Sequence, residues 1–165
     1  MSIRSAFPLL LVPVVAVVIT ITQLSSAAVI AEKTPVASGE GQFTFNGEQI
    51  DFAFEATTNK IGHAKGRAEF DNLAAQTHVE VKIDCLSAGG SVAVMTGTVL
   101  HTDDPDYPKS AQVIFAAFDG PGWAATPQDD ITPLFVVPFP GGVDCHETAP
   151  LTILPLNSGD IRVQP

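Results

Sequence analysis

The amino-acid sequence predicts an all-β protein: a small antiparallel up-and-down β-barrel of about seven or eight strands, with a β-sandwich as the alternative. Three observations lead to this prediction. Apolar and polar residues alternate over several short stretches, which is the two-residue period of a strand. Turn signals separate these stretches, and the 165 residues include 13 prolines and 13 glycines, which interrupt long helices. Consecutive short turns favour hairpins between neighbouring strands.

The N-terminus predicts export. Within residues 1–28, Arg4 precedes an apolar run and small residues follow it, which is the layout of a cleaved secretory signal. The run is short for a membrane span, so an uncleaved anchor is only the alternative. We therefore expect a secreted, periplasmic or cell-envelope protein without a stable membrane span after cleavage. Residues 29–40 are expected to form a flexible lead-in, and residues 41–165 a single β domain.

The clearest local signal in that domain is a hairpin at Asn46-Gly47. Both residues tolerate a positive φ, and alternating apolar runs flank them. A two-residue loop pairs Phe43 with Ile50 and places both on the face that packs. A third strand is expected over residues 64–70, where small inner residues alternate with charged outer ones.

The next two strands are expected over residues 78–85 and 92–100. The first has the cleanest alternation in the chain, with an inner row of Val79, Val81, Ile83 and Cys85. The second is apolar on both faces at its start. We expect it to be covered on both sides or to turn a sheet corner near Gly97.

The last strands are less regular. Residues 111–118 predict a strand, with a helix as the alternative because nearly all of the segment is small or apolar and its period is ambiguous. Residues 131–137 predict another, and Pro133 within it indicates an edge or a bulge. A turn at Asn157–Gly159 is expected to lead into a closing strand over residues 160–164.

Charge excludes some classes of partner. The chain has 18 acidic and 8 basic side chains and a formal net charge of -10. Nucleic acids and anionic membranes need a positive surface, so neither is an expected partner. The hydrophobic fraction of 45% argues against a disordered chain.

Cys85 and Cys145 are the only cysteines. An even pair in an exported chain predicts one disulfide, and a loop of this length stabilises the fold by about 4 kcal/mol in the chain-entropy model. Free or metal-binding thiols are the alternative, although CxxC spacing is absent.

A set of turn and strand motifs along the domain resembles a group of small exported bacterial proteins of uncharacterised function. The motifs are Gly41-x-Phe43, Phe52-x-Phe54, Val79 to Cys85-Leu86, Gly97, Asp103-Asp104-Pro105, Phe115 to Asp119-Gly120, and Asn157-x-Gly159-Asp160-Ile161. The resemblance implies a secreted all-β domain. It transfers no catalytic or binding residue.

An acidic loop offers the densest group of possible metal ligands. Asp103, Asp104 and Asp106 could supply oxygens to Ca²⁺, joined in space by Asp129 and Asp130. The spacing departs from known calcium loops, and a solvated loop with Asx-turns is the simpler interpretation. No other cofactor is expected. His101 beside this loop is a candidate ligand or general base, with a merely exposed histidine as the alternative.

Aromatic residues are the candidates for a ligand site inside or at the mouth of the barrel. They are Phe43, Phe45, Phe52, Phe54, Phe115, Phe118 and Trp123. A filled core is the competing interpretation for the phenylalanines, and a cover over the end of the core for the tryptophan. Glu55, Glu69 and Glu80 could form an inward carboxylate pair, but their alternation favours an outward position.

We therefore expect a noncatalytic, disulfide-stabilised module that binds a small apolar ligand or a surface partner. No catalytic residue is assigned, because no nucleophile elbow, phosphate loop or dinucleotide motif occurs. A small hydrolase or isomerase that uses carboxylates or His101 is one alternative. A structural cell-surface protein is another.

Overall fold

The computed structural model describes residue 34 and residues 36–59, 61–120, 128–138, 144–146 and 152–165. The predicted leader lies outside these residues. The strands are β1 (Val36–Phe45), β2 (Glu48–Thr58), β3 (Ala64–Asn72), β4 (Thr77–Gly89), β5 (Val92–Thr102), β6 (Gln112–Phe118), β7 (Asp130–Ile131), β8 (Phe135–Val136) and β9 (Leu154–Gln164). Among the residues described, no helix could cross a membrane.

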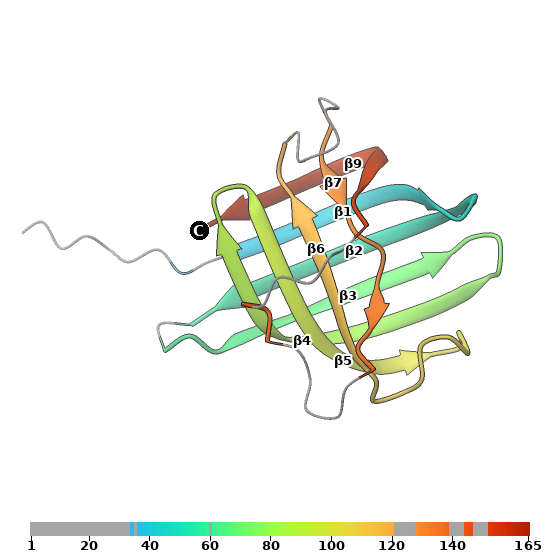
Figure 1. Cartoon of the computed structure of the whole chain (residues 1–165), viewed down its shortest axis with the longest axis horizontal. Helices are drawn as coiled ribbons and strands as arrows, with labels where there is room; N and C mark the ends of the chain where they lie inside the picture. The colour runs from blue at the N-terminus through green and yellow to red at the C-terminus, as the bar shows by residue number, and fades with distance from the viewer. Residues whose placement is uncertain (1–33, 35, 60, 121–127, 139–143, 147–151) are drawn as a thin grey trace, which may run out of the picture. The chain divides into compact units, whose positions relative to one another are not determined.

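Eight of these strands close into a barrel, which confirms the predicted fold class. Each strand from β1 to β7 pairs antiparallel with the next, β7 pairs with β9, and β9 returns to β1. Strand β8 is additional and pairs with β6. Figure 1 shows β9 lying beside β1, so that the last strand of the chain completes the ring on the first.

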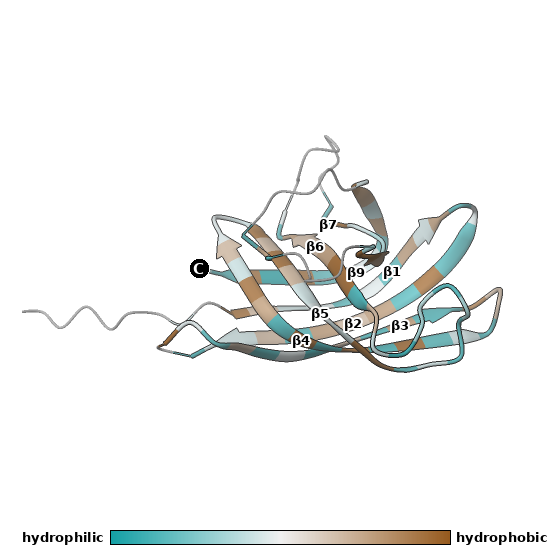
Figure 2. Cartoon of the chain, turned by 60° about the horizontal axis from the view of Figure 1, so that its bottom comes forward, coloured by the Kyte–Doolittle hydropathy of each residue, from teal (hydrophilic) through white to brown (hydrophobic). Residues whose placement is uncertain are grey.

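The Asn46-Gly47 hairpin has the predicted register. Phe43 pairs with Ile50, and both turn residues have positive φ, 53° at Asn46 and 85° at Gly47. Phe43 is buried and Ile50 packs against the core, as the alternation predicts. Bands of opposite hydropathy alternate along the strands in Figure 2.

Strand β1 begins earlier than the sequence indicates. Residues 36–40 were assigned to a flexible lead-in, but they pair with β2 on one side and β9 on the other. Alternation is weak there because Ser38 and Gly39 have little or no side chain to pack. At Gly39 a Cβ atom would lie 2.8 Å from side-chain atoms of both Phe54 and Ile161, so those larger residues fill the space.

Strand β9 is continuous, and the turn predicted at Asn157–Gly159 is a bulge within it. Gln42 pairs with Ser158 and Phe43 with Leu156, which leaves Asn157 as an extra residue. Gly159 has φ of 117°, and a Cβ atom there would lie 2.2 Å from the carbonyl oxygen of Glu40. The glycine that resembled a turn signal therefore allows two strands to approach closely.

A second bulge changes the face of Cys85. Ile83 pairs with Gly97 and Cys85 with Thr96, so Asp84 is an extra residue. Cys85 therefore leaves the inner row in which the alternation placed it, and Leu86 packs in the core. At Gly97, which lies opposite this bulge, the backbones approach closely, because a Cβ atom there would lie 2.2 Å from the carbonyl oxygen of Lys82.

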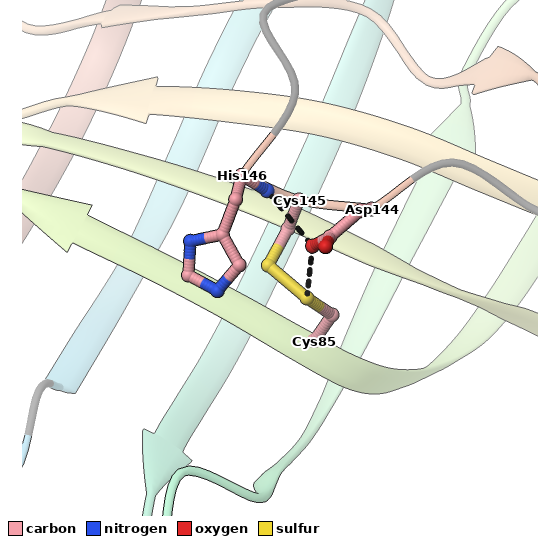
Figure 3. The surroundings of a disulfide bond; sticks show 4 residues. All are labelled: Cys85, Asp144, Cys145 and His146. Atoms are coloured by element: carbon pink, nitrogen blue, oxygen red, sulfur yellow. Dashed lines mark hydrogen bonds between the residues drawn. A yellow bond between two sulfur atoms is a disulfide. The ribbon is translucent and has the colours of Figure 1, made fainter.

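The bulge carries Cys85 to the partner that the sequence predicts. Cys85 and Cys145 form a disulfide with a Cα–Cα distance of 5.8 Å (Figure 3). Cys145 is buried, whereas Asp144 and His146 beside it are exposed. The disulfide therefore ties a short segment after β8 to β4.

Residues 112–118 form a strand, as predicted. The single strand expected over residues 131–137, with an edge or a bulge at Pro133, is instead two short strands, β7 and β8, on either side of that proline. β7 and β8 both pair with β6, but their registers differ by one residue. At the break, the Thr132 hydroxyl accepts a hydrogen bond from the Ala116 amide at 2.9 Å. The threonine side chain thus replaces the acceptor that the strand ladder loses beside proline.

Side-chain carboxylates also accept backbone hydrogen bonds where β9 joins β7 and β6 to close the barrel. Asp129 accepts hydrogen bonds from the amides of Gly120 at 2.7 Å and Ile161 at 2.6 Å. Asp119 accepts one from the amide of Val163 at 3.0 Å. Because β7 is only two residues long, these carboxylates provide much of the bonding to β9.

Five phenylalanines fill the interior. Phe115 has no exposed surface, and its ring centroid lies 5.7 Å from that of Phe54 and 5.3 Å from that of Phe70. Phe52 lies 6.1 Å from Phe54 and 5.9 Å from Phe43. These are distances at which aromatic rings are in contact. This part of the barrel is a packed core.

Candidate functional site

A pocket of about 160 Å³ opens at one end of the barrel. This end carries the β1–β2 turn, the β3–β4 turn and the loop between β5 and β6, and it is on the right in Figure 1. The apolar lining is Phe43, Phe45, Ile50, Phe70, Val79, Pro133 and Leu134, and the polar lining is Asn46, Glu48, Asn72, Thr77, Asp104, Asp106 and Tyr107. We call it the mouth pocket.

The mouth pocket is lined by members of both groups of candidate residues, the aromatic residues and the acidic loop. Phe43 and Phe45 form part of its wall, and Asp104 and Asp106 lie at its acidic side. The acidic loop reaches the pocket because it follows β5, which ends at the same end of the barrel. Phe45 is only partly buried, so it presents aromatic surface at the opening.

The acidic loop is held by its own carboxylates. Asp104 accepts hydrogen bonds from the Thr77 hydroxyl at 3.0 Å and from the Asp106 amide at 2.9 Å. Asp103 accepts one from the amide of His78, at the start of β4. The contact with the Asp106 amide is an Asx-turn, as expected of a solvated acidic loop, whereas the other two tie the loop to the start of β4. They leave the Asp106 side chain without a hydrogen bond within the part of the chain that the structure describes.

Tyr107 crosses the mouth and was not singled out from the sequence. Its hydroxyl donates to the carbonyl oxygen of Leu134 at 2.9 Å, which joins the β5–β6 loop to the segment between β7 and β8. Burial raises the pKa of Tyr107 above 10.0, and the nearby charges of Asp104 and Asp106 raise it further. The phenol therefore stays neutral and keeps its donor at physiological pH. The sequence signal that could have identified it is a single tyrosine between Pro105 and Pro108 in an otherwise acidic loop.

Every charged side chain that lines the mouth pocket is acidic. They are Glu48, Asp104 and Asp106, and among the described residues of the lining there is no lysine, arginine or histidine. Glu48 accepts a hydrogen bond from the side-chain amide of Asn72 at 2.6 Å. The pocket thus combines an apolar wall with a negative edge.

The carboxylates proposed for Ca²⁺ do not form one cluster. Asp103, Asp104 and Asp106 are not among the groups of three described ligand residues whose donor atoms converge within 4.8 Å. Asp129 and Asp130 lie at the other end of the barrel, since Asp130 pairs with Phe118 at the far end of β6. Asp130 is fully buried there, and its carboxylate has no hydrogen-bond partner in the described segments.

The remaining candidates lie away from the mouth pocket. Phe52, Phe54 and Phe115 belong to the packed core. Phe118 is buried but lies outside that core cluster, because it is three residues from Phe115 and so projects from the opposite face of β6. Trp123 falls outside the described residues.

The strand glutamates and His101 lie on the outer face. Glu69 and Glu80 form ion pairs with Arg67 at 3.0 and 3.1 Å, and Glu55 is exposed opposite the same arginine. His101 is exposed, with its ring 6.5 Å from that of His78. Acid–base chemistry would be favoured if these glutamates and His101 pointed together into the barrel. Instead they lie on its outer face.

Two larger hollows lie on the outer face of the sheet formed by β9, β1, β2 and β3, with volumes of about 680 and 450 Å³. Both are open to solvent. The larger is lined by small residues and charges of both signs, such as Ala53, Glu40 and Arg162. The charged side chains described in the lining of the smaller are acidic, such as Asp51 and Asp71. Apolar walls that could hold a small molecule are better developed at the mouth pocket. Comparison of the chain with protein-family models, curated proteins and solved structures gives no match.

Proposed function

We propose that the protein is an exported, noncatalytic binding module whose mouth pocket holds a small molecule with an apolar body and a positively charged head. The observation that carries this proposal is the composition of the pocket: phenylalanine and aliphatic walls beside Glu48, Asp104 and Asp106, with no basic side chain among the lining residues that the structure describes. An amine can interact with both parts, since carboxylates attract an ammonium group and aromatic faces attract cations.

The size of the pocket limits the apolar body. A volume of about 160 Å³ is close to the roughly 150 Å³ cavity that accommodates benzene in an engineered protein core. A single ring or a short alkyl chain therefore suits it, whereas a long acyl chain does not. The packed phenylalanines beneath Phe43 give a longer ligand no passage through the described core.

Titration with three probes of one shape tests the proposal. Benzylamine, benzyl alcohol and benzoate are added to isotopically labelled protein, and amide shifts are followed by NMR. Benzylamine should bind most tightly and shift residues around Phe45 and Tyr107. Equal binding of the three, or shifts located elsewhere, would refute the proposal.

A matched pair of variants tests the role of charge. Asp106→Asn should weaken benzylamine binding about three- to fivefold, which is the scale of an exposed charge interaction. Asp160→Asn removes the same charge on the outer face, where Asp160 pairs with Arg162, and should change binding little. A neutral effect of Asp106→Asn would assign the affinity to the apolar wall alone and remove the cationic head from the proposal.

Export is the second part of the proposal and is tested independently. Cleavage near residue 28 predicts that the exported chain lacks Arg4, and intact mass spectrometry of the secreted or envelope fraction measures this directly. The disulfide between Cys85 and Cys145 is compatible with an oxidising compartment. A full-length chain retained in the membrane fraction would instead favour an anchored surface protein.

A further inference from the structure

The two disulfide cysteines and the two residues that flank Cys145 form a group of four possible metal ligands. Cys85, Asp144, Cys145 and His146 each offer one ligand atom, and these atoms all lie within 4.8 Å of one another. Figure 3 shows the imidazole of His146 and the carboxylate of Asp144 beside the two sulfur atoms. Two sulfurs, one nitrogen and one oxygen are donors that Zn²⁺ accepts in a tetrahedral site.

Local structure brings these residues together. The bulge at Asp84 turns Cys85 to the outer face of β4, where it meets Cys145. Asp144 accepts a hydrogen bond from the amide of His146 at 3.0 Å, an Asx-turn that folds the tripeptide around the cysteine. One oxygen of Asp144 makes this bond, and its second oxygen is available to a cation.

The carboxylate of Asp144 lies next to sulfur, and its oxygen nearest to Cys85 is Oδ1, which also accepts the His146 amide. Asp144 Oδ1 lies 3.6 Å from Cys85 Sγ, the contact drawn as a dashed line in Figure 3. A disulfide sulfur carries no proton, so it cannot donate a hydrogen bond. In the reduced state the carboxylate would oppose ionisation of the thiols unless a cation were present. A divalent cation reverses that repulsion.

We propose that reduction converts the Cys85–Cys145 disulfide into a four-ligand site for a soft divalent cation such as Zn²⁺. A dithiol reductant supplies the two electrons that break the S–S bond, becomes a disulfide itself, and leaves two thiols on the chain. Zn²⁺ then binds the two sulfurs as thiolates and releases two protons to solvent. The segment at residues 144–146 is thus tied to β4 by a covalent bond in oxidising surroundings and by a metal ion in reducing ones.

Cobalt titration of the full chain tests this proposal. The protein is reduced with a phosphine under argon, the phosphine is removed, and Co²⁺ is added as a spectroscopic substitute for Zn²⁺. We expect one equivalent to give thiolate-to-metal absorption and the visible bands of tetrahedral Co²⁺, and Zn²⁺ to abolish both. The oxidised chain should give neither signal.

Variants distinguish the four ligands from other donors. Cys85→Ser with Cys145→Ser should remove the absorption, and Asp144→Ala or His146→Ala should each weaken Co²⁺ binding at least about tenfold. Asp144 and His146 are exposed, so these variants should fold. His101→Ala is the matched control, because His101 is an exposed histidine outside the cluster, and it should leave binding unchanged.

Three outcomes would overturn the proposal. The first is the absence of cobalt absorption in the reduced chain. The second is a Co²⁺ affinity of the Asp144→Ala and His146→Ala variants equal to that of the reduced parent chain. The third is binding of Co²⁺ by the oxidised chain as tightly as by the reduced chain. Circular dichroism accompanies each titration. If reduction alone unfolds the barrel, Zn²⁺ must restore the β-sheet spectrum, and its failure to do so also counts against the site.

Discussion

Removal of the Cys85–Cys145 disulfide should lower the free energy of unfolding by about 4 kcal/mol. The bond joins positions 60 residues apart in the chain. For a loop of that length the chain-entropy relation gives roughly 14 cal/mol/K, or about 4 kcal/mol at 25 °C. The barrel itself closes through strand pairing from β1 to β9. The loss should therefore arise mainly from a freer unfolded chain and not from a disrupted core.

Urea denaturation of the double variant Cys85→Ser/Cys145→Ser, followed by far-ultraviolet circular dichroism, measures this difference. We expect a lower midpoint and a larger denaturant slope, because the unfolded chain without the cross-link exposes more surface. The melting temperature should fall by roughly 15 °C, from the average unfolding entropy per residue. All buffers contain EDTA, which prevents metal ions from replacing the bond.

A second variant separates loop entropy from side-chain chemistry. Cys145 is buried, with an exposed fraction of 2%, so a serine hydroxyl there adds a desolvation penalty that alanine does not. Cys85→Ala/Cys145→Ala should therefore be at least as stable as the serine variant, and still about 4 kcal/mol below the parent. A difference of less than about 1 kcal/mol between parent and alanine variant would refute the entropic reasoning.

Four further predictions concern the barrel and its mouth. Gly97→Ala should destabilise the fold by at least about 2 kcal/mol in urea denaturation, because the new Cβ atom meets a carbonyl oxygen of β4. Phe115→Ala should lower the unfolding free energy by about 3–5 kcal/mol in the same assay. Asp129→Ala should lower it by about 3 kcal/mol, since two amides lose a charged acceptor. Tyr107 is the only tyrosine, so tyrosinate absorbance should report its raised pKa, and Asp106→Asn should lower that pKa. Because the unfolded chain ionises this tyrosine at lower pH than the folded chain, stability should fall as the pH rises above 10.0. An unshifted tyrosinate titration would contradict the burial of Tyr107 beside Asp104 and Asp106.

The sequence predicted best where a local rule decides the structure. Asn46-Gly47 determines both the turn and its register, so the pairing of Phe43 with Ile50 could be predicted before any tertiary contact was known. The pairing of Cys85 with Cys145 followed from the absence of any other cysteine. Gly97 within an apolar strand indicated an irregular position, and the structure has a close backbone approach there.

Bulges account for most of what could not be predicted. One extra residue at Asp84 reverses the inner and outer faces of everything that follows it in β4, and alternation alone cannot reveal where that residue lies. Asn157 has the same effect in β9, where it resembled part of a turn. Phe118 was a different error, because its spacing of three from Phe115 places the two on opposite faces of any regular strand.

The mouth pocket escaped prediction because it depends on contacts between distant segments. Phe45 and Asp106 lie 61 positions apart, and no local pattern indicates that they line one opening. The acidic residues and the aromatic residues were each recognisable as a group. Only closure of the barrel, which sets the β5–β6 loop beside the β1–β2 turn, shows that the two groups belong to one site.

The acidity of the chain also acquires a structural explanation. Where strand pairing is interrupted, an aspartate oxygen repeatedly accepts the backbone amide that pairing would otherwise satisfy, as Asp129 does for Ile161 and Asp103 for His78. Part of the dense acidic sequence therefore serves to satisfy backbone amides. Asp106 differs, because no such bond to its side chain exists among the described residues while it lines the pocket. Its position in the pocket lining, and not the number of carboxylates around it, therefore makes the mouth the place to look for a bound ammonium group.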